Sequence, residues 1–119
     1  MTLVQNDRLA VVKIGLVNII PQAIRYQADL RLKANELVVL LNILLGYEGG
    51  DGSVLIEKDT IAARVGKDVR TVQRVVKTLE QKSLVVRHPH YADNGQQVGN
   101  EYDVRPLARL IQSFNSNEI

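Results

Sequence analysis

Apolar residues recur with helical period in two neighbouring segments near the middle of the chain. In the second segment they occupy positions i, i+3, i+4 and i+7: Val72, Val75, Val76 and Leu79. This spacing puts them on one face of a helix. The other face carries basic and amide side chains: Arg70, Gln73, Arg74 and Lys77, with Thr71 at the edge. We therefore predict an amphipathic helix over residues 68–82, with Asp68 as its N-cap.

A shorter helix is predicted just before this one. Ile61, Ala62 and Val65 would form its core face, and Gly66 would supply the left-handed residue that ends it. The turn made by residues 66–68 has the length found between the two helices of a helix-turn-helix. The second helix can thus pack on the protein and still present a polar face outward.

A β-hairpin is predicted directly after the second helix. Residues 84–91 are rich in strand formers, the Asp-Asn-Gly sequence at 93–95 favours a hairpin turn, and residues 98–104 form the return strand. On that strand Tyr102 and Val104 should share a face. Pro89 cannot donate a hydrogen bond to a sheet, which predicts an edge strand or a bulge there.

The segments around this unit are structural in our interpretation. Residues 34–46 are apolar nearly all round, which predicts a central buried helix. Residues 48–53 are a glycine-rich connector, and residues 54–56 could add a third strand. A final helix over 106–114 would turn three residues inward: Leu107, Leu110 and Ile111.

The first residues form an apolar arm in our interpretation. Residues 11–20 are expected to be extended, and residues 21–27 to form a short helix that begins at Pro21. The arm either packs on the central helix or exchanges with a second copy, and we favour packing within the chain.

Charge is concentrated in the segment that carries the predicted helix pair. The whole chain has 15 basic and 13 acidic residues, a formal net charge of +2. Between residues 54 and 91 eight basic residues stand against four acidic ones, a net +4, so the remainder carries −2. Such a concentration of basic residues is the electrostatic footprint expected of a protein that binds a phosphate backbone.

Several functional classes find no support in the composition. Cysteine is absent, which excludes a disulfide framework and a thiolate zinc site and suits a cytoplasmic protein. No apolar run is long enough to cross a membrane. His88 and His90 have metal-ligand spacing but no third ligand nearby, so we predict no metal site. We also expect no enzyme activity, no cofactor and no small-molecule ligand, because no catalytic arrangement is evident.

The polar face of the second helix has the chemistry of base recognition. Arginine can bond to O6 and N7 of guanine together, glutamine can bond to N6 and N7 of adenine, and lysine suits phosphate. The Thr71 hydroxyl and the amides at the helix start are natural phosphate contacts. We therefore predict double-stranded DNA as the partner, with this helix in the major groove.

The order of helix, helix-turn-helix and hairpin resembles the winged helix-turn-helix domains of bacterial plasmid and phage replication proteins and of related transcriptional regulators. The segments that carry the resemblance are 59–62, Gly66, 70–74, 79–80, 84–85 and 99–104. The match covers residues 32–111. It implies that four residues of the recognition helix face the bases: Val69, Arg70, Gln73 and Arg74.

The hairpin departs from that family at its tip. Wings that grip DNA usually carry arginine or lysine there, whereas residues 92–97 contain no basic residue and one acidic residue. Arg87, lower on the first strand, is therefore the wing residue expected to contact a phosphate.

These observations predict a mainly helical α+β fold, a winged helix-turn-helix with a three-helix core, a β-hairpin wing, an N-terminal arm and a C-terminal helix. The arm would span 1–31, the domain 32–113 and a flexible tail 114–119. The predicted DNA contacts are Lys67, Val69, Arg70, Thr71, Gln73, Arg74, Lys77 and Arg87.

Some alternatives stay open at the level of sequence. A winged helix can also serve as a protein-interaction module without DNA binding. Within the DNA-binding interpretation, replication initiation and transcriptional regulation are not separated. A homodimer is plausible because helix-turn-helix proteins often bind paired half-sites. A DNA-binding protein of this kind would be cytoplasmic and associated with the nucleoid.

Overall fold

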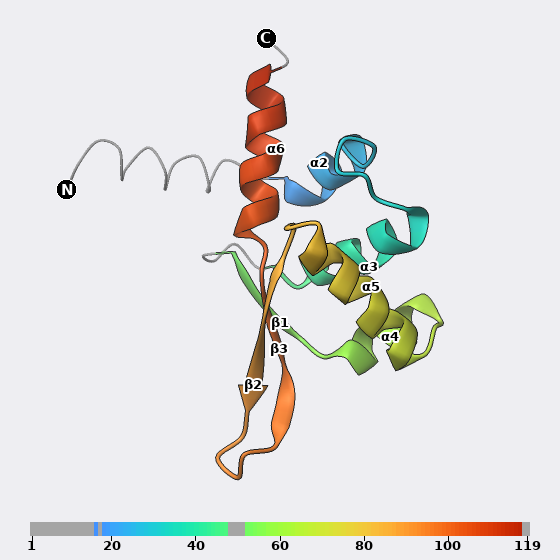
Figure 1. Cartoon of the computed structure of the whole chain (residues 1–119), viewed down its shortest axis with the longest axis vertical. Coiled ribbons are helices and arrows are strands. Elements are labelled where there is room, and N and C mark those ends of the chain that lie inside the picture. Colours follow the sequence, from blue (N-terminus) through green and yellow to red (C-terminus); the bar gives the residue numbers. More distant parts are fainter. Residues whose placement is uncertain (1–15, 17, 48–51, 118–119) are drawn as a thin grey trace, which may run out of the picture.

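The described part of the chain, residues 16, 18–47 and 52–117 of the computed structural model, is built from helices and one small sheet (Figure 1). The element order is α2 (Ile19–Arg25), α3 (Ala34–Leu45), β1 (Ser53–Ile56), α4 (Lys58–Val65), α5 (Val69–Gln81), β2 (Val86–Tyr91), β3 (Gln97–Asp103) and α6 (Arg105–Asn117). This is the predicted mainly helical α+β arrangement. No helix within these ranges is long and apolar enough to cross a membrane.

Helices α4 and α5 form the predicted helix-turn-helix. Gly66 ends α4 with a left-handed φ of 71°, a conformation that glycine adopts without strain. Asp68 is the N-cap of α5, and its Oδ1 accepts the backbone N–H of Thr71 at 2.7 Å. The predicted apolar stripe of α5 is buried: Val72, Val75, Val76 and Leu79. The predicted helix and its rotational phase are therefore confirmed.

Helix α3 packs against both of these helices, but it is not buried all round. Leu40 and Ile43 are fully buried, as expected of a central helix. On its opposite side Val38 is 45% exposed and Leu45 is 63% exposed. The prediction of burial on every side was wrong, because neighbouring helices cover only one face of α3.

The sheet has the strand order β1-β3-β2, and both pairings are antiparallel. This confirms that the short segment before α4 joins the hairpin as a third strand. β2 is an edge strand, which tolerates the missing N–H of Pro89. Tyr102 of β3 pairs with Val54 of β1 and is fully buried, as is Val104. In Figure 1 the β2–β3 hairpin projects from the helical part at the end opposite to α6.

The described part of the N-terminal arm belongs to the core. Ile19, Ala23 and Tyr26 of this segment are buried, and α2 packs on α3 and α6. The helix begins at Ile19, two residues before its predicted start at Pro21, so residues 19–20 are helical and not extended. Pro21 lies in the first helical turn, where its missing N–H costs no intrahelical hydrogen bond. Residues 11–15 and 17 of the predicted extended segment and residues 48–51 of the connector lie outside the described residues.

Helix α6 is longer than the sequence predicts. It continues to Asn117, so residues 114–117 of the expected tail are helical, and only 118–119 lie outside the described residues. Leu107 and Ile111 are fully buried as predicted. Phe114 packs its ring against Tyr26, with 5.3 Å between the centroids, and the Tyr26 hydroxyl donates a 2.6 Å hydrogen bond to Asn115 Oδ1. These contacts with α2 extend the last helix beyond the expected boundary.

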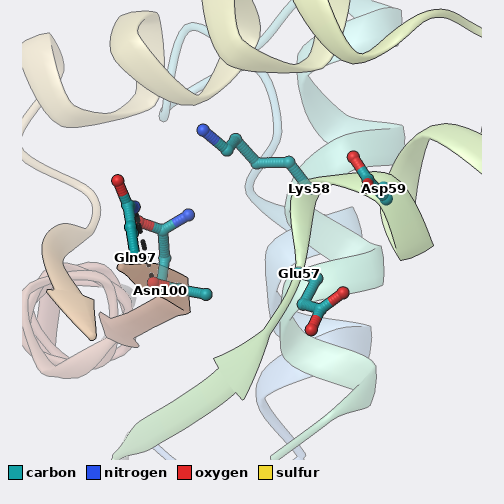
Figure 2. Close-up of a pocket in the computed structure, with 6 residues that line it drawn as sticks. Glu57, Lys58, Asp59, Gln97 and Asn100 are labelled. Carbon is teal, nitrogen blue, oxygen red and sulfur yellow. Dashed lines mark hydrogen bonds between the residues drawn. The ribbon is translucent and has the colours of Figure 1, made fainter. Parts of the chain in front are cut away.

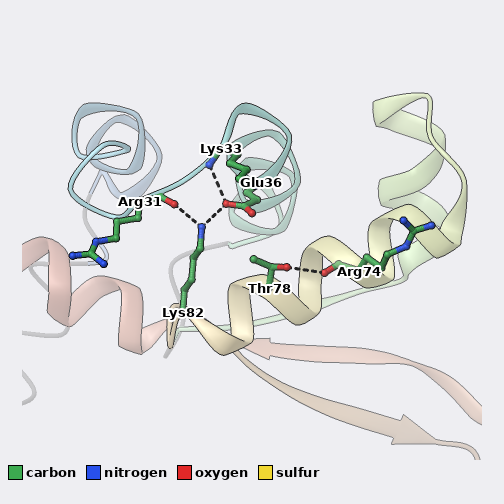
Figure 3. A network of polar contacts seen from close by, with 6 residues as sticks. All are labelled: Arg31, Lys33, Glu36, Arg74, Thr78 and Lys82. Carbon is green, nitrogen blue, oxygen red and sulfur yellow. Dashed lines mark hydrogen bonds and ion pairs between the residues drawn. The ribbon is translucent and has the colours of Figure 1, made fainter.

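A partly buried ion pair joins the end of α5 to the start of α3 (Figure 3). Glu36 is only 6% exposed, and its Oε1 lies 2.6 Å from Lys82 Nζ and accepts the Lys33 backbone N–H at 2.9 Å. Lys82 also donates to the carbonyl of Arg31. The Lys33 N–H first, and then the bond from Lys82, hold the pKa of Glu36 below its usual value. Neither residue stands out in the sequence, since each is an ordinary charged position of an amphipathic helix.

Candidate nucleic-acid interface

The outward face of α5 carries the predicted polar set. Four side chains are exposed on it: Arg70, Gln73, Arg74 and Lys77. They lie on this face because the valines and leucine of the stripe take the opposite one into the core. Within the described part of the chain, none of the three cations makes an ion pair. Three positive charges and one amide are therefore presented to solvent on a single rigid helix.

The start of α5 is less open than the sequence indicates. Lys67 is exposed, as a phosphate contact would need to be. Val69, however, is half-buried and packs against the core. The backbone N–H of Thr71 is bound to the Asp68 carboxylate and is not free for a phosphate. Hydrogen bonds from Thr71, through its hydroxyl and then its N–H, hold the pKa of Asp68 below its usual value.

Arg87 links α5 to the β2–β3 hairpin. Its Nε lies 3.4 Å from Glu80 Oε1 on α5, and its Nη1 donates a 3.1 Å hydrogen bond to Asn100 Oδ1 on β3. The side chain is 35% exposed. The sequence suggested a free wing cation, but the tertiary structure places this guanidinium between two elements of its own chain.

A pocket that the sequence did not indicate lies between β3 and the start of α4 (Figure 2). The residues that line it are Glu57, Lys58, Asp59, Gln97, Gly99 and Asn100. Asn100 is fully buried, a rare environment for an asparagine. A sequence signal would have been hard to find, because these residues come from two segments about forty positions apart.

The tip of the wing lacks the positive charge that the outward face of α5 carries. The turn residues 93–95 at its tip are exposed and carry no positive charge. On the hairpin His90 Nε2 lies 2.9 Å from Glu101 Oε2, and both side chains are partly exposed. Among the described residues no group of three or more histidine or acidic side chains is placed to hold a metal ion.

Comparison with known proteins agrees with this geometry. Residues 30–85, which include α3, β1, α4 and α5, match the protein family described as "Helix-turn-helix domain". A solved structure described as a possible transcriptional regulator from Methanosarcina mazei Go1 shares the fold, with a TM-score of 0.53 and 23% sequence identity over 77% of this chain and 77% of that chain. No curated protein matches the chain.

The fold and the comparisons define a class of protein. A helix-turn-helix followed by a β-hairpin on a three-stranded sheet is a winged helix-turn-helix, a class of DNA-binding domain. Residues 30–85 match that family, and within them α4 and α5 form the helix-turn-helix. The hairpin β2–β3 is the wing, and α2 and α6 complete the core.

Proposed function

We propose that this protein binds double-stranded DNA with α5 in the major groove and regulates transcription. The observation that carries the proposal is the outward face of α5, where Arg70, Gln73, Arg74 and Lys77 are exposed opposite a fully packed apolar stripe. A helix in the major groove needs one face for its own protein and one for the bases. The shared fold of the possible transcriptional regulator from M. mazei favours regulation, and replication initiation is the second candidate process.

Each side chain has a proposed role that follows from its chemistry. Arg70 and Arg74 can each donate two parallel hydrogen bonds to guanine, and Gln73 can pair with adenine. Lys77 and Lys67 contact phosphates, and these contacts position the helix without reading sequence. A phosphate contact of the Thr71 hydroxyl would require this group to leave the Asp68 carboxylate to which it donates. Val69 would contribute only at the edge of the interface, because it is half-buried.

The role of Arg87 is revised by its surroundings. A guanidinium already shared between Glu80 and Asn100 has fewer donors left for a phosphate. We propose that Arg87 holds the wing against α5, and that its phosphate contact is secondary.

Fluorescence anisotropy against random duplex DNA over a salt series tests the proposal. Affinity should fall steeply as salt rises, because bound cations on DNA are released when lysines and arginines replace them. The double variant Arg70→Ala, Arg74→Ala should lose most of this binding. A matched control is Arg25→Ala, Arg109→Ala, which removes two exposed arginines from α2 and α6. Absence of binding by the unmodified protein at low salt would reject the proposal.

The alternative of a protein-interaction module finds no support on the outward face of α5. Interaction hot spots are typically aromatic or large apolar side chains. The exposed large hydrophobic residues of the described chain lie on other elements: Ile24, Val38, Leu45, Leu55, Val86 and Tyr91. A homodimer on paired half-sites stays a prediction, and sedimentation with and without a selected DNA site would test it.

A further inference from the structure

Two large apolar side chains are exposed close together where α3, β1 and α4 meet. Leu45 at the end of α3 is 63% exposed and Leu55 in β1 is 65% exposed, and both line the same open pocket. Single exposed leucines are ordinary on a protein surface, but neighbouring ones form an apolar patch of the kind that marks an interaction site. We call the surface formed by these two leucines, Glu57, Thr60 and Arg64 the α3–β1–α4 face.

The rim of this face carries one acidic and one basic side chain of α4. Glu57, the N-cap residue, and Arg64, in the last turn, are both exposed and both line the pocket. They are two helical turns apart, roughly 10 Å, so they lie on the same side of α4 with Thr60 between them. Figure 2 shows the Glu57 carboxylate directed away from Gln97 and Asn100. Within the described part of the chain, neither Glu57 nor Arg64 makes an ion pair.

We infer that the α3–β1–α4 face binds the same face of a second copy of the chain around a two-fold axis. In such a contact a residue i of one copy meets a residue j of the other, and j meets i. Two α4 helices that pack antiparallel across the axis place Glu57 of each copy opposite Arg64 of the other copy, and the leucines cover one another between these charges. A partner with one sign of charge would match only one end of α4, whereas a second copy matches both. An apolar centre with a polar rim is also the usual composition of a protein interface.

Pairing through this face does not use the outward face of α5. None of the four exposed polar side chains of α5 lines the pocket. The dimer therefore carries two copies of α5, as a protein that binds paired half-sites requires. Dimer formation does not depend on the proposed DNA-binding function and is measured without DNA.

Sedimentation equilibrium of the full chain over a range of concentrations tests for the dimer. The mass should rise with concentration toward twice the 13.3 kDa of one chain. Leu55→Ser should raise the dissociation constant of the dimer about tenfold, because the apolar contact is lost in both copies. Val86→Ser on β2 removes an exposed apolar side chain outside the α3–β1–α4 face and should leave the constant unchanged, which makes it the matched control.

Charge reversal tests the proposed pairing across the axis. Glu57→Arg and Arg64→Glu each turn attraction into repulsion on both sides of the axis, so either change should weaken the dimer about tenfold. The double variant re-forms the pairs with exchanged signs and should return to within about threefold of the unmodified protein. It carries an unfavourable charge at each end of the α4 dipole, so its recovery cannot come from a more stable helix. Arg25→Glu makes the same charge change on the exposed surface of α2 and is the control.

A single cysteine locates the two-fold axis. Thr60 lies between Glu57 and Arg64, so antiparallel α4 helices bring its two copies together at the axis. Because the chain contains no cysteine of its own, a short bis-maleimide should join two copies of Thr60→Cys, whereas Ser113→Cys on the exposed surface of α6 should stay unlinked. This arm stands even if charge reversal alters folding, and thermal unfolding of each variant identifies such a case.

The outcomes distinguish this dimer from others and from DNA binding. A monomer at every concentration overturns the α3–β1–α4 dimer. A dimer that ignores both reversals and is not cross-linked through Thr60→Cys overturns it too, because that dimer uses another surface. Weakening by the single reversals without recovery in the double variant overturns the pairing of Glu57 with Arg64. None of these results bears on DNA binding, which the Arg70 and Arg74 double variant tests separately.

Discussion

Gln73 and Arg74 are two side chains of α5 whose chemistry can distinguish one base from another. Both are exposed and stand off the buried stripe. We expect Gln73→Ala and Arg74→Ala each to cost about 1–3 kcal/mol of binding free energy on a preferred site and to relax the preference at one base pair. Site selection followed by anisotropy on matched and mismatched duplexes measures both effects.

Lys77 provides the comparison for these two positions. As a phosphate contact, Lys77→Ala should weaken binding to all sequences about equally. Thermal unfolding should be nearly unchanged in all three variants, because none of the positions is buried. If both Gln73→Ala and Arg74→Ala bound every sequence like the unmodified protein, the assignment of the base-reading face would be wrong.

The Glu36 carboxylate makes stability depend on pH. Its pKa is lowered in the folded protein, so its stabilising contribution is present above the unfolded value of 4.5 and is lost as pH falls through the folded pKa. We expect Glu36→Gln to lower the free energy of unfolding by about 1–3 kcal/mol at pH 7, because it leaves Lys82 without its carboxylate. The difference from the unmodified protein should shrink as pH falls below 4.5.

Urea unfolding at a series of pH values measures this difference. Asp29→Asn, an exposed acidic position outside the ion pair, is the control and should follow the unmodified protein. An equal stability loss for Glu36→Gln at pH 3 and pH 7 would show that the ion pair with Lys82 is not its cause.

At the scale of elements, Arg87 connects α5 with the wing. Its guanidinium bridges Glu80 on α5 and Asn100 on β3. We expect Arg87→Met to lower the free energy of unfolding by about 1–2 kcal/mol, a discounted value because the pair is partly solvent-exposed. The salt slope of DNA binding should fall by less than the roughly 0.9 units of a full phosphate contact.

Two measurements on the same variant decide between the roles of Arg87. Urea unfolding reports its structural part, and anisotropy over a salt series reports its phosphate part. If Arg87→Met left the free energy of unfolding unchanged and lowered the salt slope by the roughly 0.9 units of one phosphate contact, Arg87 would be a wing cation that binds DNA and not a structural bridge. Arg109→Met, on exposed α6 surface, controls for the loss of charge and chain length.

At the scale of the whole molecule, α2 and α6 close the fold by packing on each other. Phe114 is half-buried against Tyr26. We expect Phe114→Ala to lower the free energy of unfolding by about 1–3 kcal/mol, since it loses buried apolar area and the ring pair. Truncation after residue 113 should cost at least as much, because it also removes Asn115, which accepts from the Tyr26 hydroxyl.

Thermal or urea unfolding measures these losses, with Ser113→Ala as an exposed neighbour on the same helix. A truncated protein as stable as the full chain would mean that the domain ends near residue 113, as the sequence suggested. DNA affinity should be little changed at temperatures well below the transition, because α6 carries none of the proposed DNA contacts.

The sequence by itself determined the elements whose signal is local. The apolar stripe of α5, the Asp68 cap and the Gly66 turn are set by neighbours within a few positions, and the structure confirms all three. The hairpin was likewise predictable, because its strand-forming residues and its Asp-Asn-Gly turn are local signals, and the structure adds the short strand β1 beside it.

Only the tertiary structure decided which polar residues meet. The Lys82–Glu36 pair, the Arg87 bridge and the pocket beside Asn100 each join segments that are separated along the chain or belong to different elements. The sequence pattern does not identify such a partner, because a charged residue occupies the same polar position of the pattern whether its side chain contacts solvent or another side chain. The length of α6 was decided in the same way, because its last turn is held by α2 and not by its own sequence.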